Sequence, residues 1–171
     1  MRYITAPDLA ERPGARELAQ VATAEHQRMV PHELMEATLR GGDRSSWSAD
    51  QVEVADDALR RIEDAVSQAE SIIDGYLARR GYPLPLTPVP ELVTGWARDI
   101  ARYLLHKDRA GKDDGDPIVR AYRDALKFLE LTATGRFSLG ALDPIVAAAD
   151  AADVRFESAP TVFSREHRRG F

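Results

Sequence analysis

Four histidines are the first residues in this sequence that could carry out acid–base or metal chemistry: His26, His32, His106 and His167. The fragment HELME places His32 beside a glutamate, as in the helix of a zinc protease. Such a helix needs a second histidine four positions further on, where this sequence has Glu36. We therefore interpret His32 as a surface histidine and not as a zinc ligand.

The other fragments with a chemical character are equally incomplete. GKDDGD, residues 111–116, is acidic enough for calcium but lacks the ligand spacing and terminal glutamate of a calcium loop, so we interpret it as a turn between helices. AGKDDG follows no strand and lacks phosphate-loop spacing, and no serine has a glycine elbow or an arranged base. The chain has no cysteine, which excludes disulfides, thiolate zinc sites and cysteine nucleophiles. The sequence predicts no catalytic residue, no metal site and no cofactor.

Length and charge further limit the classes of protein to which this chain can belong. A chain of 171 residues fits one ordinary domain, and its net charge of −5 argues against a general nucleic-acid binder, whose surface should be basic. No apolar run reaches about 18 residues, so we expect no membrane span. The first residues, MRYITAPDLAERPG, contain no long apolar region, so we expect no signal peptide.

A long amphipathic helix over residues 49–80 is the clearest element. Ser48 with Gln51 forms a capping box before it, and Gly81 ends it. A helix of this length cannot bury its own apolar stripe, so it needs partner helices. The stripe recurs at steps of three and four: Val52, Ala55, Leu59, Ile62, Val66, Ala69, Ile73 and Tyr76.

Shorter helices supply those partners, and the fold class is all-α, a small helical bundle. We expect helices beginning after Thr5, over about 15–28, within VPHELMEATLRGG (residues 30–42, closed by its two glycines), from about residue 90 to 107, and from Pro117, capped by Asp116, to about residue 134. The bundle spans 1–135, with a surface insertion at about 26–48, and an extended arm that can hold one short helix spans 136–171. The predicted core residues are Leu59, Ile62, Val66, Ile73, Trp96, Ile100, Tyr103, Tyr122, Leu126 and Leu129.

Four prolines in eight residues separate the long helix from the next one: Pro83, Pro85, Pro88 and Pro90. Each proline fixes its own φ and pushes the preceding residue to extended geometry. We interpret this segment as a rigid, straight spacer that holds the two helices at a fixed distance.

The long helix carries eight acids against four arginines, and the acids are Asp50, Glu53, Asp56, Asp57, Glu63, Asp64, Glu70 and Asp74. One interpretation is a solvated face, to which the lone acid Asp74 also belongs. The other is a surface that repels passing nucleic acid.

The C-terminal arm also allows two interpretations. It ends FSREHRRGF, and its aromatic and cationic residues are Phe156, Phe163, Arg165, Arg168, Arg169 and Phe171. A frayed terminus is one interpretation. A docking peptide is the other, because phenylalanine and arginine are suited to interface contacts and large apolar residues continue to the last position.

Several stretches resemble one known family. They are MRYITAPDL at the start, IDGYLARRGYPLPL and DIARYLLH in the middle, and YRDALKFLELTATGRFSLG further on. In order and spacing they are similar to the Mu-like phage family of head–tail joining (neck) proteins, first catalogued as a phage domain of unknown function. The terminal FSREHRRGF also resembles that family's final motif. The stretches 26–48 and LDPIVAAADAADV carry no such resemblance.

The resemblance implies a helical connector without catalytic residues, located in the virion neck and, during assembly, in the host cytoplasm. Such proteins form a homo-oligomeric ring of twelve copies beneath the portal protein of the phage head. The ring extends the channel for genomic DNA, which passes without sequence-specific binding, and a tail-side stopper or tail terminator protein docks on it. No membrane is involved.

Two other interpretations stay open at this point. One is a non-enzymatic helical binding protein or assembly chaperone that acts as a monomer or dimer. The other is an enzyme, which would need a deep pocket with converging titratable groups.

Overall fold

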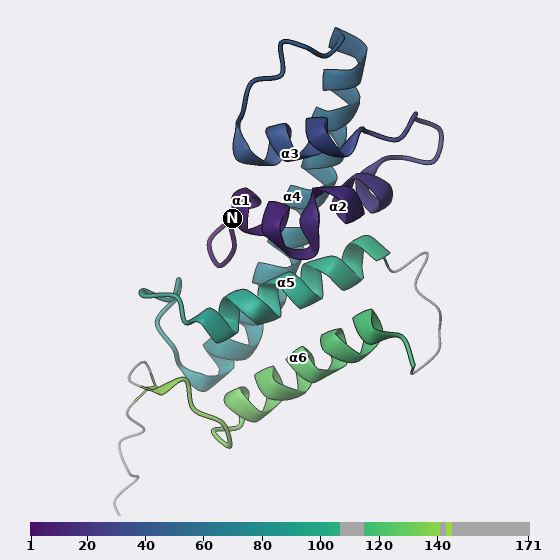
Figure 1. Ribbon diagram of the computed structural model, residues 1–171. Helices are drawn as coiled ribbons and strands as arrows, with labels where there is room; N and C mark the ends of the chain where they lie inside the picture. The colour runs from purple at the N-terminus through teal and green to yellow at the C-terminus, as the bar shows by residue number, and fades with distance from the viewer. Residues whose placement is uncertain (107–114, 141–142, 145–171) are drawn as a thin grey trace, which may run out of the picture.

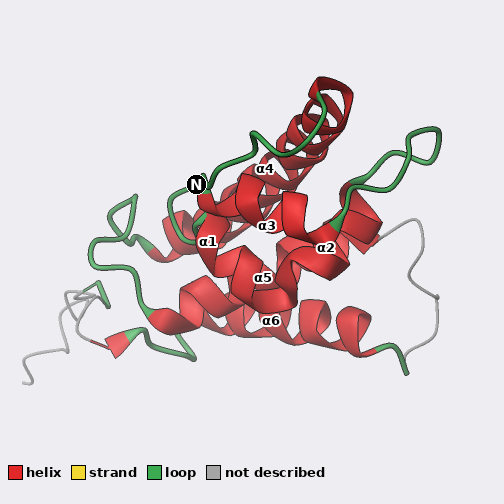
Figure 2. Ribbon diagram, turned by 45° about the horizontal axis from the view of Figure 1, so that its top comes forward, coloured by secondary structure: helices red, strands yellow, loops and turns green. Residues whose placement is uncertain are grey.

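The computed structural model describes residues 1–106, 115–140 and 143–144, and these residues form helices and loops with no strand among them (Figure 1 and Figure 2). The all-α prediction is confirmed. The elements in chain order are α1 (Ala6–Leu9), a wide turn η1 (Ala10–Gly14), α2 (Ala15–Ala22), α3 (His32–Arg40), α4 (Ala49–Arg80), α5 (Glu91–His106) and α6 (Pro117–Ala133). None of these helices combines the length and apolar character needed to cross a membrane.

Helix α4 is the axis of the fold, about 48 Å long at 1.5 Å per residue. The predicted boundaries are confirmed: Ser48 and Gln51 form a reciprocal capping box, and Gly81 ends the helix in the left-handed region at φ 95°. One end of α4 packs on α2 and α3, and the other end packs on α5 and α6 (Figure 1). This single helix therefore joins an N-terminal layer to a C-terminal helical hairpin.

The N-terminal layer begins as predicted, with Thr5 and Asp8 forming a capping box at α1. Helix α2 is shorter than the predicted 15–28, because it ends at Ala22. The side chain of Thr23 donates to the carbonyl of Ala19 at 2.6 Å and accepts the N–H of Val30 at 3.3 Å. These bonds replace the helical ladder and turn the chain back toward α3.

The prediction that residues 26–48 lie on the surface is wrong for one face of α3 and for Val30, two residues before it. The core includes Val30, Leu34, Met35 and Leu39, each with at most 3% of its surface exposed. A nine-residue helix shows only two turns of periodicity, which is too short to reveal a buried face from sequence.

The proline-rich segment 81–90 connects α4 and α5 without holding them apart. The two helices pack directly on each other, and the connecting chain bends near Leu84 and again near Thr87, so the straight spacer is a wrong prediction. Tyr82 and Leu86 are buried at 4% and 3% exposure and fasten the segment to the bundle. Among the four prolines, Pro83, Pro85 and Pro88 are exposed and Pro90 is half-buried. The rigidity of the segment stays a prediction.

The core is continuous through the described helices. Of the ten predicted core residues, six are buried: Ile62, Val66, Ile73, Trp96, Ile100 and Leu129. The other four, Leu59, Tyr103, Tyr122 and Leu126, are half-buried. Tyr103 and Tyr122 stack with their ring centroids 3.9 Å apart, at the surface where α5 meets α6.

Candidate functional site

Glu70 on α4, only 3% exposed, is the one Asp, Glu, Lys or Arg residue that is buried in the described part of the chain. Its carboxylate accepts the backbone N–H of Tyr3 at 2.9 Å and the backbone N–H of Arg2. The Nε of Arg2 lies 3.4 Å from the other carboxylate oxygen. Glu70 therefore fastens the N-terminal segment to the middle of the long helix.

Asp74, one turn further along α4, also binds the N-terminal segment. We call the contacts of Arg2 and Tyr3 with Glu70 and Asp74 the N-terminal clamp. The hydroxyl of Tyr3 donates to Asp74, and an Arg2 guanidinium nitrogen lies 2.8 Å from its carboxylate. Burial and the hydrogen bond to Asp74 raise the pKa of Tyr3 to about 12. The interpretation of Asp74 as a lone solvated acid is wrong, since helical spacing could not show that the N-terminal segment returns to this turn.

A second cluster fastens α2 to α5. The Arg102 guanidinium donates to both carboxylate oxygens of Glu17, at 2.6 and 2.7 Å, and His106 Nε2 lies 2.9 Å from Glu17 Oε1. Burial acts to raise the pKa of Glu17, but these two partners outweigh it and lower the pKa below its usual range. Such a bidentate pair fixes the angle between two helices.

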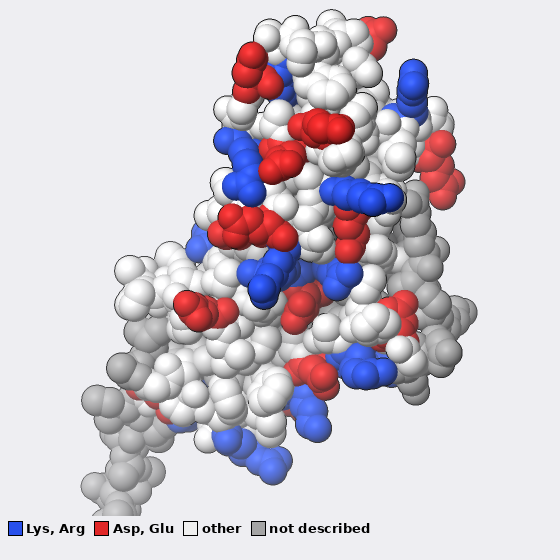
Figure 3. Space-filling model, viewed as in Figure 1, with Lys and Arg blue, Asp and Glu red and all other residues white. Residues whose placement is uncertain are grey.

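The acidic face of α4 is partly neutralised within the chain. Asp56 pairs with Arg44, and Asp57 pairs with Arg61 and, at 3.2 Å, with Arg60. The acids of this helix that remain exposed, with no ion pair among the described residues, are Asp50, Glu53, Glu63 and Asp64. On the face shown in Figure 3, acidic and basic side chains are interspersed and no large area carries one sign.

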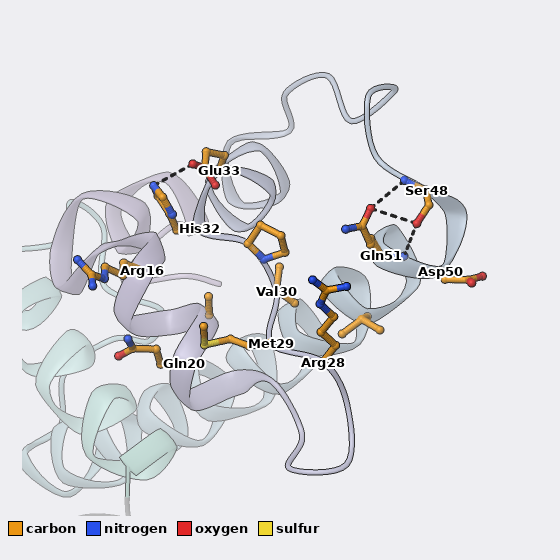
Figure 4. A pocket seen from close by; sticks show the side chains of 13 residues that line it. Arg16, Gln20, Arg28, Met29, Val30, His32, Glu33, Ser48, Asp50 and Gln51 are labelled. Carbon is orange, nitrogen blue, oxygen red and sulfur yellow. Dashed lines mark hydrogen bonds and ion pairs between the residues drawn. The ribbon is translucent and has the colours of Figure 1, made fainter.

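A hollow of about 1110 Å³ lies between α2, the loop before α3 and the first turns of α4 (Figure 4). Its lining mixes apolar and charged residues: Arg16, Ala19, Gln20, Arg28, Met29, Val30, Pro31, His32, Glu33, Ser48, Asp50, Gln51 and Val54. Met29, one of these lining residues, is 59% exposed. The hollow is therefore a mixed apolar and charged surface near the start of α4.

The polar groups of this hollow do not converge. His32 pairs with its neighbour Glu33 at 3.2 Å, as an exposed pair. The Ser48 hydroxyl is engaged with Gln51 across the helix cap, on the opposite side of the hollow from His32 (Figure 4). No group of three or more histidine, aspartate or glutamate side chains in the described part of the chain could hold a metal ion. GKDDGD and His167 fall mainly or wholly outside the described residues.

The second surface feature is an aromatic face on α5, α6 and the residues after α6, made of Leu92, Trp96, Phe128 and Phe137. Trp96 and Phe128 stack at 6.4 Å between ring centroids, and Phe137 lies 5.4 Å from Phe128 with its ring edge-on. Trp96 is buried, whereas Leu92 and Phe128 are 43% and 41% exposed. The apolar stripe that the sequence predicts for α6 runs through residues 118, 122, 126 and 129. Phe128 lies outside that stripe, and this was the sequence signal that a second apolar surface exists here.

Several described residues after α6 pack against the bundle, among them Phe137, Leu139 and Asp143. The hydroxyl of Tyr82 donates to Asp143 and accepts the N–H of Leu139 at 3.3 Å, and Arg80 lies 3.7 Å from the Asp143 carboxylate. The hydrogen bond from Tyr82 lowers the pKa of Asp143. We call this set of contacts the Asp143 clasp. Residues 136–140 and 143–144, predicted as part of the extended arm, therefore pack on the bundle instead.

The predicted docking residues of the arm, Phe156 to Phe171, lie outside the described residues. The fold and these surfaces together define a class of protein, an all-α bundle. Its described ion pairs connect segments of the same chain, and some apolar side chains remain exposed at its surface.

The family described as "Bacteriophage Mu, Gp36" matches residues 3–158, and this chain belongs to it. The Mu-like prophage FluMu protein gp36 of Haemophilus influenzae is 36% identical over 111 residues, which cover 65% of this chain and 75% of that relative. Gene product J of Escherichia phage Mu is 35% identical over 117 residues, covering 68% of this chain and 77% of that relative. The matched range includes the stretch 26–48 and the whole of LDPIVAAADAADV, residues 142–154, for which the motifs alone showed no resemblance.

Proposed function

We propose that this protein is a head–tail adaptor, a non-enzymatic structural component of the phage neck. In this role it forms a ring beneath the portal protein, extends the DNA channel and presents a docking surface to tail-side neck proteins.

Membership of a bacteriophage Mu family is the observation that carries this proposal. The architecture supports it, because ion pairs between α2 and α5 and between the N-terminus and α4 make a subunit that keeps its shape. A ring of identical subunits requires two different patches on each subunit that fit each other. The hollow at one end and the aromatic face near the other are two different surfaces on which neighbouring subunits could make such contacts.

The charge of the chain also suits a channel protein. A net charge of −5 disfavours tight binding of DNA, which must slide through a neck without being held. The exposed acids that remain on α4, among them Glu53 and Asp64, are the residues of that helix available for such repulsion.

Size-exclusion chromatography with light scattering tests the proposal, on the purified protein alone and with portal protein added. We expect a ring or a stoichiometric complex with the portal. A monomer or dimer that does not bind the portal protein would instead support the alternative function, a helical binding protein or assembly chaperone. Electron micrographs of purified particles with the neck resolved provide the direct test of location.

The proline-rich segment gives a second test of the ring. We expect the double substitution Pro83→Ala, Pro85→Ala to lower the yield of rings in mass photometry, because exposed prolines restrict the segment that joins α4 to α5. Unchanged assembly would remove any role for the rigidity of this segment.

A further inference from the structure

We propose that the aromatic face of one copy binds the C-terminal segment, residues 145–171, of a second copy of this chain. This inference rests on the proposed function, because it requires two copies of the chain to lie next to each other, as they do in a ring. It assigns a receptor surface to the terminal phenylalanines, which would otherwise be available only to the portal or to tail proteins.

The aromatic face needs an occupant. The large apolar side chains that are exposed in the described part of the chain are Met1, Met29, Leu92 and Phe128, and two of these four belong to this face. Beneath Phe128, Trp96 is 4% exposed and forms a firm base for it. An exposed phenylalanine packed on a buried tryptophan, with an exposed leucine one turn before that tryptophan, is a surface suited to an apolar partner.

The C-terminal segment has the right composition and starts in the right place. It contains 171 − 145 + 1 = 27 residues, three of them phenylalanines. Phe137 is part of the aromatic face, and the Asp143 clasp is six residues further on, so the described chain ends within about 20 Å of the face. Fully extended, the remaining residues span up to about 90 Å, which is enough to reach an adjacent copy.

The proposed ring favours a second copy over the same copy. The described residues 136–140 and 143–144 lead from the end of α6 toward the end of α4, where Tyr82 and Arg80 hold Asp143 (Figure 1). The contact of Phe137 with Phe128 and the Asp143 clasp already tie the chain to its own bundle. In a ring the adjacent copies lie in contact, so the aromatic face of a neighbour is within the span of the remaining 27 residues.

The chemistry of the contact follows from the geometry. Phe128 and Phe137 already meet edge to face, and Phe128 lies nearly parallel to Trp96 at an interplanar angle of 17°. A further phenylalanine on Phe128 would continue this arrangement. The segment carries both charge signs, so apolar contact, and not charge, selects the site.

Photo-crosslinking of the full-length protein tests the proposal. Benzoylphenylalanine is introduced at position 128, and isotopically heavy and light copies are mixed before irradiation. We expect crosslinks from position 128 to residues 145–171 in heavy–light pairs. Crosslinks to the same copy's segment, to another surface, or no crosslinks at all would overturn the proposal. Benzoylphenylalanine at exposed Glu36, on α3 at the other end of the molecule, is the matched control and should not reach the segment.

A reciprocal experiment places the probe at position 163 and compares Phe128→Ser with Lys127→Ser, its exposed neighbour. We expect Phe128→Ser to lower the crosslink yield to α5 and α6 about tenfold, as for loss of an interface aromatic, and Lys127→Ser to leave it unchanged. Equal yields in both variants, each shown to be folded by circular dichroism, would refute the site. Portal binding measured on the same samples separates the two proposals. A portal complex without this crosslink contradicts only the receptor surface, and the crosslink without portal binding contradicts only the head–tail role.

Discussion

The N-terminal clamp at Glu70 allows the sharpest test of how this fold is held together. Glu70 is 3% exposed, and its carboxylate accepts two backbone N–H groups, from Arg2 and Tyr3. Glu70→Ala leaves the N–H of buried Tyr3 without a partner, whereas Arg2 is exposed and its N–H can bind water instead. The unpaired Tyr3 N–H costs about 1–3 kcal/mol and the lost bond from Arg2 to a charged acceptor about 1.5–3 kcal/mol, so the gross penalty is roughly 2.5–6 kcal/mol.

Detachment of the N-terminal segment limits this cost. Tyr3 and Ile4 are 3% and 1% exposed, and each contributes about 1.5–3 kcal/mol of burial that detachment would lose. Detachment also returns backbone freedom to the segment. We therefore expect Glu70→Ala to lower the free energy of unfolding by about 2–4 kcal/mol.

A graded series separates the charge from the hydrogen bonds. Glu70→Gln keeps an acceptor oxygen but loses the carboxylate, and bonds to charged groups exceed neutral ones by about 1 kcal/mol. We expect this variant to fall between the wild type and Glu70→Ala. Glu63→Ala, at an exposed position of the same helix, is the control and should stay within about 0.5 kcal/mol of the wild type.

Urea titrations followed by far-ultraviolet circular dichroism measure these differences. Limited proteolysis with chymotrypsin, which cleaves after tyrosine, reports detachment at Tyr3 independently. If Glu70→Ala were as stable as Glu63→Ala, or more stable than Glu70→Gln, the reasoning from buried unpaired donors would be refuted.

Three further predictions concern the pH response, the core and the arm. Because burial and Asp74 raise the pKa of Tyr3 to about 12 from its ordinary 10.0, stability is fully present below about pH 10 and falls as the pH rises toward 12. Tyr3→Phe should reduce that loss in urea titrations at high pH, and an unchanged slope would contradict it. Trp96→Ala should lower the free energy of unfolding by about 3–5 kcal/mol, since Trp96 supports Phe128 and Phe137; an unaltered melting temperature would show that it is not core. Truncation after Ala159 should leave the circular dichroism unchanged but weaken binding to the portal in size-exclusion runs, and full binding would rule against the arm.

Local sequence signals predicted the long helix because its ends are chemical features. The side chains of Ser48 and Gln51 satisfy the first backbone donors, and Gly81 adopts a left-handed conformation that other residues resist. The same reasoning placed Asp116 at the start of α6. These signals act over three or four residues, which is why a single sequence reveals them.

Burial in the small N-terminal layer was harder to predict. Helix α3 offers Leu34, Met35 and Leu39 to the core, but so short a helix carries too few repeats to distinguish a buried face from a solvated one. The proline-rich segment shows a related failure. Its composition restricts each φ angle, yet the path of the chain between α4 and α5 depends on where Tyr82 and Leu86 find a place to pack.

The sequence by itself therefore determined the helical class, the principal helix ends, the absence of cysteine chemistry and the motifs that resemble one phage family. Only the tertiary structure decided that Glu70 and Asp74 hold the N-terminus, that Asp143 returns to Tyr82 and Arg80, and that Phe128 remains exposed on a packed aromatic base. The physical reason is distance along the chain. Caps and stripes are short-range patterns, whereas each of these contacts joins residues tens of positions apart, and whether a charge is solvated or paired depends on which distant segment packs beside it.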